Sequence, residues 1–238
     1  MSKKKNHQFE TKVIHSGQKP DPTTGAVMTP IVLASTYNQS SPGVHKGYDY
    51  SRSTNPTREA FENCIADLEN GIKGYGFSSG VAAISACVEL LSPGDHIIAM
   101  DDLYGGSVRL FNEIKSISQG IEISYVDMTD IINIKNNIKN NTKMIFIETP
   151  TNPLLKISDL SKITKLAKKE NIITVCDNTF ASPYNQRPID FGVDIVIHSA
   201  TKYIGGHSDL IAGALIIGKN DKKLIDRMSN IHNSLGPI

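Results

Sequence analysis

Apolar and polar residues follow two different periods along the chain after Pro56. Short runs rich in Ile and Val, bounded by Gly, Pro, Asn or Asp, predict β-strands at 96–102, 121–127, 143–150, 172–178, 193–199 and 212–218. Stretches whose apolar residues recur every three or four positions predict helices at 57–70, 80–91, 106–117, 130–140, 159–170 and from 221 onward. Strands that alternate with helices in this way predict an α/β fold.

Several of the predicted strands are hydrophobic at nearly every position. Such strands are buried on both faces, which indicates a mostly parallel sheet with helices on both sides. Residues 1–55 are rich in Pro, Ser, Thr and Gly and lack this rhythm, so they are predicted to form an extended arm. Residues 56–238 are predicted to form one α/β domain. Because no G-x-G-x-x-G motif follows a first strand, a dinucleotide-dependent oxidoreductase is disfavoured.

The charge balance indicates which partners to expect. The 238 residues include 25 Lys and Arg and 24 Asp and Glu, a formal net charge of +1, so no general attraction to nucleic acid or to a membrane surface is expected. Lys3 to Lys5 are interpreted as a solvated tail. No apolar run follows these lysines and none is long enough to cross a bilayer, so the protein is predicted to be cytoplasmic.

The cysteines Cys64, Cys87 and Cys176 are odd in number and widely spaced. Each lies in an apolar or helical context, which favours buried, reduced thiols over disulfides or a zinc site.

Polar side chains gather just after the predicted strands, where an open parallel sheet binds its ligands. Glu148 and Asn152 follow one strand, Asp177 follows the next, and the segment HSATK from His198 to Lys202 follows a third. We therefore expect an acid, an amide, hydroxyls and a lysine to meet at one edge of the sheet.

Lys202 stands in a tract of small hydroxyl and glycine residues. A nucleophilic lysine must lose its proton near neutral pH, and burial among small uncharged residues favours the neutral amine. Pyridoxal 5′-phosphate (PLP) is the aldehyde that best explains the neighbouring residues, because its ring nitrogen needs a carboxylate partner and its phosphate needs donors. Asp177 suits the nitrogen, and Ser199 and Thr201 suit part of the phosphate.

Further candidates complete this picture, each with a plainer alternative. Ser79 and Gly80 open a small-residue helix whose amides would favour a phosphate, although many serine-capped helices bind nothing. Tyr104 would stack on a planar cofactor, or pack on its own loop. Tyr50 and Arg52 lie in the arm, where arginine would suit a phosphate but is more often part of a surface ion pair.

Three other polar residues have structural interpretations that are favoured over chemical ones. His198 and His207 lack a third ligand, so hydrogen-bonded histidines are expected rather than a metal site. Glu148 is more readily explained by a hydrogen bond at a strand end than as a general base.

Together these segments resemble the PLP-dependent enzymes of transsulfuration, which include cystathionine γ-lyase and cystathionine γ-synthase. The resemblance rests on YSRSTNPT, FSSGVAA, DDLYGG, ETPTNP, the DNTF segment and HSATKYIGGHSD, which occur in the family's order between about residues 10 and 236. It implies the large domain of a fold-type I PLP-dependent transferase, and γ-lyases are the most similar branch.

The resemblance also implies roles for individual residues. Lys202 would hold PLP through a Schiff base and then move protons, Asp177 would pair with the ring nitrogen, and Tyr104 would stack on the ring and assist proton transfer. Asn152 would contact the cofactor's phenolic oxygen. The phosphate would be bound by Gly80, Val81, Ser199 and Thr201, and by Tyr50 and Arg52 of a neighbouring subunit in a homodimer or tetramer.

The implied activity is γ-elimination from cystathionine, giving cysteine, 2-oxobutyrate and ammonia, with homocysteine as a further substrate. The alternatives are cystathionine γ-synthase, which joins an O-acylhomoserine to cysteine, and an inactive PLP-binding module. In the family a smaller C-terminal domain supplies the arginine that binds the substrate carboxylate. That domain is expected to be absent from the 238 residues, so the activity of this chain by itself is left open.

Overall fold

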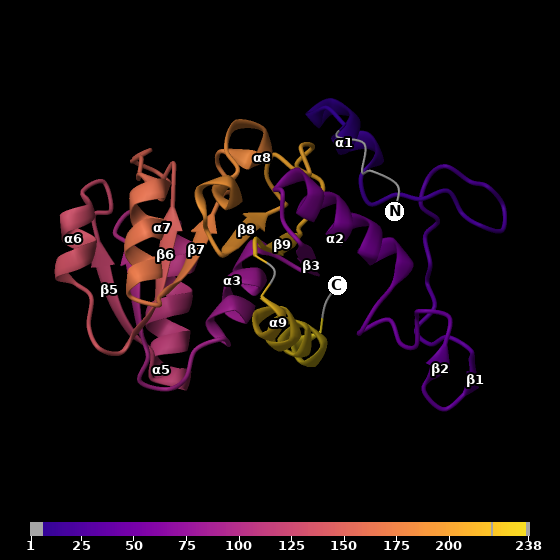
Figure 1. The fold of residues 1–238 in the computed structure, drawn as a ribbon, viewed down its shortest axis with the longest axis horizontal. Helices are drawn as coiled ribbons and strands as arrows, with labels where there is room; N and C mark the ends of the chain where they lie inside the picture. The colour runs from indigo at the N-terminus through magenta and orange to yellow at the C-terminus, as the bar shows by residue number, and fades with distance from the viewer. Residues whose placement is uncertain (1–6, 220, 237–238) are drawn as a thin grey trace.

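A seven-stranded sheet forms the centre of the molecule in the computed structural model, which describes residues 7–219 and 221–236 (Figure 1). The predicted tail at Lys3 to Lys5 lies outside the described residues. The strand order is β3-β9-β8-β7-β6-β4-β5. The strands are β3 (Lys73–Phe77), β4 (His96–Met100), β5 (Glu122–Val126), β6 (Thr142–Glu148), β7 (Ile173–Asp177), β8 (Ile195–Ser199) and β9 (Gly213–Ile217). β9 runs antiparallel to both neighbours, and the other pairs are parallel.

The strands predicted from their hydrophobicity are confirmed, and β4 and β9 are buried at every position. β3 was not predicted, because its sequence KGYGF interrupts the apolar pattern with two glycines. The structure explains Gly74, where a Cβ atom would lie 2.1 Å from the backbone oxygen of Glu62. The close approach of a helix to this strand therefore removes the usual sequence signal of a strand.

Helices cover both faces of the sheet (Figure 1). α3 packs on β8 and β9 and contacts α9 and the π-helical segment η1, whereas α2 packs on β3 and β9 from the other side, and α7 contacts β7 and the 3₁₀ segment η2. The covering elements are α2 (Pro56–Leu68), α3 (Gly80–Val88), α4 (Gly105–Arg109), η1 (Leu110–Lys115), α5 (Ser116–Gln119), α6 (Ile131–Asn136), α7 (Leu160–Lys169), α8 (Ser182–Asn185), η2 (Pro188–Phe191) and α9 (Lys222–Leu235). This is the predicted α/β architecture.

Residues 7–55 contribute no strand to the large sheet. They contain α1 (Phe9–His15) and a small hairpin of β1 (Gln39–Ser41) and β2 (Val44–His45), and they extend beyond α2 at one end of the molecule (Figure 1). The division into an arm of residues 1–55 and a domain of residues 56–238 stays a prediction.

Buried polar groups close the free edge of β3 and hold the arm against it. Glu62 accepts a hydrogen bond from the Gly76 amide at 2.9 Å, and His232 of α9 donates to the Gly76 carbonyl at 2.7 Å. Arg58 pairs with Glu62 at 3.1 Å and donates to the carbonyls of Ser51 and Ser53 at 2.7 and 3.0 Å. One connected network therefore links the arm, α2, β3 and α9.

The prediction of reduced cysteines is confirmed, and the prediction of their burial is confirmed for two of the three. Cys87 and Cys176 are buried free thiols, whereas Cys64 is only half-buried on α2. Within the described ranges, no helix has the length and apolar character needed to cross a membrane.

Candidate active site

The carboxyl ends of the central strands open into one cavity of about 1040 Å³. Glu148 ends β6 and is the register partner of Asp177 at the end of β7, and Asp177 pairs in turn with Ile197 of β8. The predicted residues that line this cavity are Lys202, Tyr104, Asp177, Ser199, Thr201, Gly80, Val81 and Asn152. The structure thus brings together residues that are up to 122 positions apart between Gly80 and Lys202.

The start of α3 forms one wall of the cavity. Ser79 caps the helix by accepting a hydrogen bond from the Ala82 amide at 3.1 Å. A Cβ atom on Gly80 would lie 2.7 Å from the Cβ of Ser199, and one on Gly213 would lie 2.0 Å from the Ser79 carbonyl oxygen. Both glycines are therefore needed to seat the loop directly on β8 and β9, beside Ser199 and Thr201.

The Asp177 carboxyl group is only 8% exposed at the floor of the cavity. Burial raises its pKa, and hydrogen bonds from Thr179 and the charge of His198 partly offset this rise. Thr179 donates its amide to Asp177 at 3.0 Å and accepts from the Ser199 amide at 2.8 Å, which fixes the ends of β7 and β8 together. A cation placed against Asp177 would restore its charged form.

Glu148 is a second buried acid beside Asp177, with 5% of its surface exposed. Burial, and then the charge of Asp177, raises the pKa of Glu148 to about 8. Its Oε2 accepts a hydrogen bond from the Tyr104 amide at 3.0 Å. The predicted strand-end hydrogen bond is therefore confirmed.

Tyr104 follows β4 in a loop that is tied to the loop after β6. Asp102 accepts hydrogen bonds from the Thr151 hydroxyl and, at 2.9 Å, from the Leu154 amide. The Tyr104 ring is 47% exposed and lines the cavity together with Asn152. The ring is thus free to contact a planar molecule, as the sequence suggested.

Lys202 lies in the turn after β8, where its amide donates to the Ser199 carbonyl at 3.1 Å. The side chain is exposed at the cavity mouth, so the expectation that its small neighbours would bury it is wrong for this chain. Small residues leave a side chain uncovered unless another group packs over it.

Behind the cavity is a fully buried cluster that the sequence did not reveal. Glu69 accepts hydrogen bonds from His198 Nε2 and from Asn178 Nδ2, the latter at 2.8 Å. Asn178 and His198 directly adjoin Asp177 and Ser199, so the cluster supports both strand ends. Glu69 gave no signal because it lies at the end of a predicted helix, far from these strands in sequence.

The structural interpretation of the histidines is confirmed. His198 is hydrogen-bonded inside this cluster, and His207 Nδ1 lies 3.0 Å from the Gly205 carbonyl on the surface. Over the part of the chain that the structure describes, no three His, Cys, Asp or Glu side chains come together as a metal site.

Tyr50 and Arg52 are not among the residues that line the cavity. They lie on the arm, where the Arg52 guanidinium stands 5.6 Å from the centre of the Tyr50 ring. Both side chains are exposed, and their proposed place in the site of a neighbouring subunit stays a prediction.

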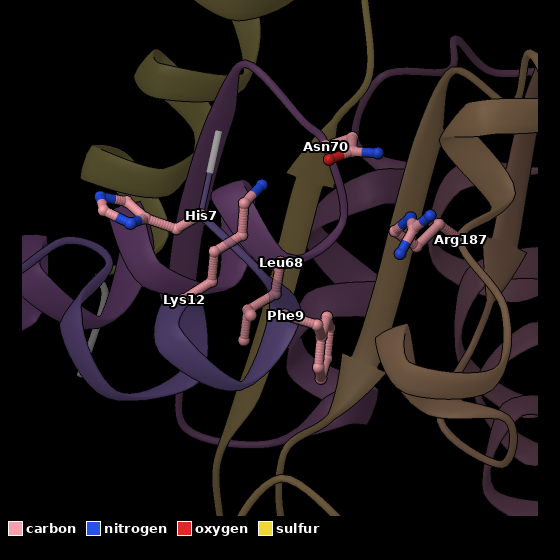
Figure 2. A pocket seen from close by; sticks show the side chains of 6 residues that line it. All are labelled: His7, Phe9, Lys12, Leu68, Asn70 and Arg187. Atoms are coloured by element: carbon pink, nitrogen blue, oxygen red, sulfur yellow. The ribbon is translucent and has the colours of Figure 1, made fainter. Parts of the chain in front are cut away.

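A second hollow of about 240 Å³ lies where α1 meets the end of α2 (Figure 2). Its lining residues are His7, Phe9, Lys12, Leu68, Asn70 and Arg187. Lys12 pairs with Asp67 at 3.4 Å and Arg187 with Asp190 at 2.8 Å. Because these cations already have carboxylate partners, this hollow is a weaker candidate than the cavity at the strand ends.

The residues of the large cavity fit PLP. Lys202 offers an amine for the aldehyde, Asp177 a buried carboxylate for the ring nitrogen, and Tyr104 an exposed ring for stacking. The first amides of α3 lack partners within the helix and, with the Ser199 hydroxyl, form a set of donors suited to a phosphate. The Thr201 hydroxyl lines the same cavity and is hydrogen-bonded to the backbone of Ala212.

Comparisons with known proteins give the same assignment. The family model described as "Cys/Met metabolism PLP-dependent enzyme" matches residues 10–238. The chain is 56% identical over 235 residues to a cystathionine beta-lyase of Coxiella burnetii, covering 99% of the chain and 60% of that protein. It is 46% identical to a cystathionine gamma-lyase of Bacillus subtilis, covering 96% of the chain and 60% of that protein.

A solved structure has the same fold. The cystathionine gamma-lyase of Lactobacillus plantarum complexed with L-serine superposes with a TM-score of 0.94 at 46% identity, covering 98% of this chain and 60% of that one. A probable cystathionine gamma-synthase of Herpetosiphon aurantiacus is also 46% identical, covering 98% of the chain and 72% of that protein. The chain thus spans about 60% of the length of most of these relatives.

Proposed function

Because the chain belongs to the Cys/Met metabolism PLP-dependent enzymes, we propose that it provides the cofactor-binding part of a carbon–sulfur lyase acting on cystathionine. The observation that carries this proposal is the convergence of Lys202, Asp177 and Tyr104 in one cavity at the ends of the parallel strands. Relatives named beta-lyase, gamma-lyase and gamma-synthase support the substrate class without separating the reactions.

Bound PLP supplies an aldehyde and a ring that accepts electrons from a substrate carbon. Lys202 would hold the cofactor at the cavity mouth, and its amine would remove and return protons there. Asp177 would keep a negative charge against the ring nitrogen. Tyr104 would stack on the ring, Asn152 would orient it, and the start of α3 with Ser199 and Thr201 would bind the phosphate.

We propose γ-elimination as the specific reaction, giving cysteine, 2-oxobutyrate and ammonia. Its support is the motif set described above and the similarity to γ-lyases. Purified protein loaded with PLP is incubated with cystathionine, and the oxo acids are separated. The proposal predicts 2-oxobutyrate; cystathionine formed from an O-acylhomoserine and cysteine, with no oxo acid from cystathionine alone, would identify a γ-synthase.

β-Elimination is the second candidate, favoured by the 56% identity to a protein named cystathionine beta-lyase. In this reaction the same cystathionine gives homocysteine, pyruvate and ammonia. The oxo acid therefore separates the two lyases in a single assay. A chain that binds PLP, releases neither oxo acid and forms no cystathionine from an O-acylhomoserine and cysteine would be the inactive module considered above.

The arm leads to a proposal about assembly. Tyr50 and Arg52 are exposed and lie outside the cavity of their own chain, and large apolar side chains of the arm, among them Met28, Ile31 and Leu33, are exposed as well. We propose that the arm packs on a second copy of the chain, where Tyr50 and Arg52 complete the phosphate site. The homo-oligomer is then a dimer, or a tetramer built from dimers.

A further inference from the structure

Glu148 and Asp177 are two buried acids that share one end of the sheet. They are register partners on the parallel strands β6 and β7, so their side chains point to the same face, and both line the large cavity. Two carboxylates this close in a buried site repel each other, which disfavours the state in which both are charged.

The groups around this pair come from every neighbouring element. Asp102 and Tyr104 face Glu148 from the loop after β4, Cys176 lies within β7, His198 acts on Asp177 from β8, and Lys202 lines the same cavity. Asp102 adds negative charge, and the buried Cys176 thiol has a pKa raised well above its usual value.

Hydrogen bonds and local charges offset only part of the rise in pKa that burial and mutual repulsion cause in these two acids. The amides of Tyr104 and Asn152 stabilise the charged form of Glu148, yet burial and the charge of Asp177 outweigh them and place its pKa at about 8. At pH 7 the cofactor-free pair therefore holds close to one proton, and Glu148 is the acid that is better placed to keep it, since Thr179 and His198 favour the charged form of Asp177.

We propose that Glu148 carries this proton in the cofactor-free protein and gives it up when the ring nitrogen of PLP is placed against Asp177. The inference rests on the proposed function, which assigns Asp177 to the ring nitrogen. The O–H bond of Glu148 breaks and an N–H bond forms at the ring, so no electron is transferred and no proton is taken from solvent. The ring's positive charge then stabilises the ionised Glu148, which still accepts the Tyr104 amide.

Proton uptake on PLP binding tests this inference. Isothermal titration calorimetry at pH 7, in two buffers of different ionisation enthalpy, measures the protons exchanged per PLP bound. Glu148→Gln keeps an oxygen for the Tyr104 amide but has no proton to release, so it should take up about one proton more than the wild type. The difference should shrink as the pH rises through about 8, where wild-type Glu148 is already ionised.

Glu113→Gln is the matched control, because Glu113 is exposed on η1 outside the cavity. It should bind PLP with the wild-type proton exchange. Equal proton uptake by the wild type and Glu148→Gln at pH 7 would overturn the inference.

A second measurement needs no variant, in case Glu148→Gln fails to fold. Infrared difference spectra of the wild type, recorded before and after addition of PLP, should show the loss of a protonated carboxyl band that shifts on ¹³C-glutamate labelling. PLP binding without loss of such a band would refute the inference and leave the proposed function standing. A wild type that binds no PLP would contradict the proposed function itself.

Discussion

Asp177 is the residue whose charge the cofactor site depends on most directly. It is buried, its pKa is raised by burial, and the proposed cationic ring nitrogen would be its strongest charge partner. Asp177→Asn keeps the shape of the side chain and removes the charge. Since hydrogen bonds to charged groups contribute about 1.5–3 kcal/mol, PLP affinity should fall about 10- to 100-fold.

Equilibrium titration of the purified variant with PLP, followed by its absorption spectrum, measures this loss. Asp226→Asn on the exposed side of α9 is the control and should bind PLP as the wild type does. Undiminished affinity in Asp177→Asn would show that Asp177 does not contact the ring nitrogen.

At the scale of elements, α9 is held to the edge of the sheet by a histidine that must stay neutral. Burial is the main cause that lowers the pKa of His232 to about 4, and its Nε2 donates to the Gly76 carbonyl. The unfolded chain binds a proton at this histidine near pH 6.5, whereas the folded chain does not until about pH 4. His232 therefore makes folding less favourable as the pH falls from 6.5 toward 4.

This linkage predicts a stability loss of up to about 2 kcal/mol for the wild type between pH 6.5 and 5 from His232 alone. His232→Gln can still donate to Gly76 and does not titrate, so its stability should fall less over the same interval. Urea unfolding at the two pH values measures both. Identical losses in the two proteins would mean that His232 is not buried as a neutral ring.

The contact between the arm and α2 depends on Arg58. Its guanidinium is buried against Glu62 and donates to the carbonyls of Ser51 and Ser53. Arg58→Gln leaves the Glu62 charge without its partner, which costs about 3–5 kcal/mol in buried pairs. We expect a lower urea midpoint and faster amide hydrogen exchange around residues 51–53, with no such change in Arg109→Gln on the exposed side of α4. Unchanged exchange in the arm would contradict this anchoring role.

The elements show why sequence reasoning succeeded in some places and failed in others. Strands such as β4 and β6 are buried on both faces, so composition alone identified them and placed Glu148 and Asp177 at one edge. β3 was not predicted because Gly74, which allows the close contact with α2, interrupts the apolar pattern of a strand. The direction of β9 depends on pairing between distant strands, which hydrophobic periodicity does not encode.

At the scale of the whole molecule, the burial of Lys202 was predicted wrongly for a related reason. Neighbours in sequence do not cover Lys202 here. The groups proposed to cover it are a cofactor bound in the cavity and the arm of a second copy of the chain, and neither is encoded in the residues next to Lys202. The Glu69 cluster was missed because Glu69 and His198 meet only through the fold. The strand ends therefore told which residues meet in the cavity, whereas the burial of Lys202 and the Glu69 cluster depended on packing that the sequence pattern does not encode.

The proposed exchange of arms predicts complementation between two inactive variants. Lys202→Ala lacks the amine, and Arg52→Ala lacks the arginine that would serve the partner. In a mixed dimer one of the two sites regains both groups, so co-refolding equal amounts should make about a quarter of all sites complete. This gain is measured as lysine-bound PLP above the mean of the two variants refolded apart. No more lysine-bound PLP in the co-refolded mixture than in the two variants refolded separately would exclude a shared site.

The central claim is that the Lys202 amine bonds covalently to PLP. The protein is loaded with PLP, reduced with borohydride, digested, and mapped by mass spectrometry. The account predicts one pyridoxyl adduct, on the peptide containing Lys202, and its loss in Lys202→Ala. An adduct confined to another lysine, or no adduct in a protein that remains folded, would contradict it.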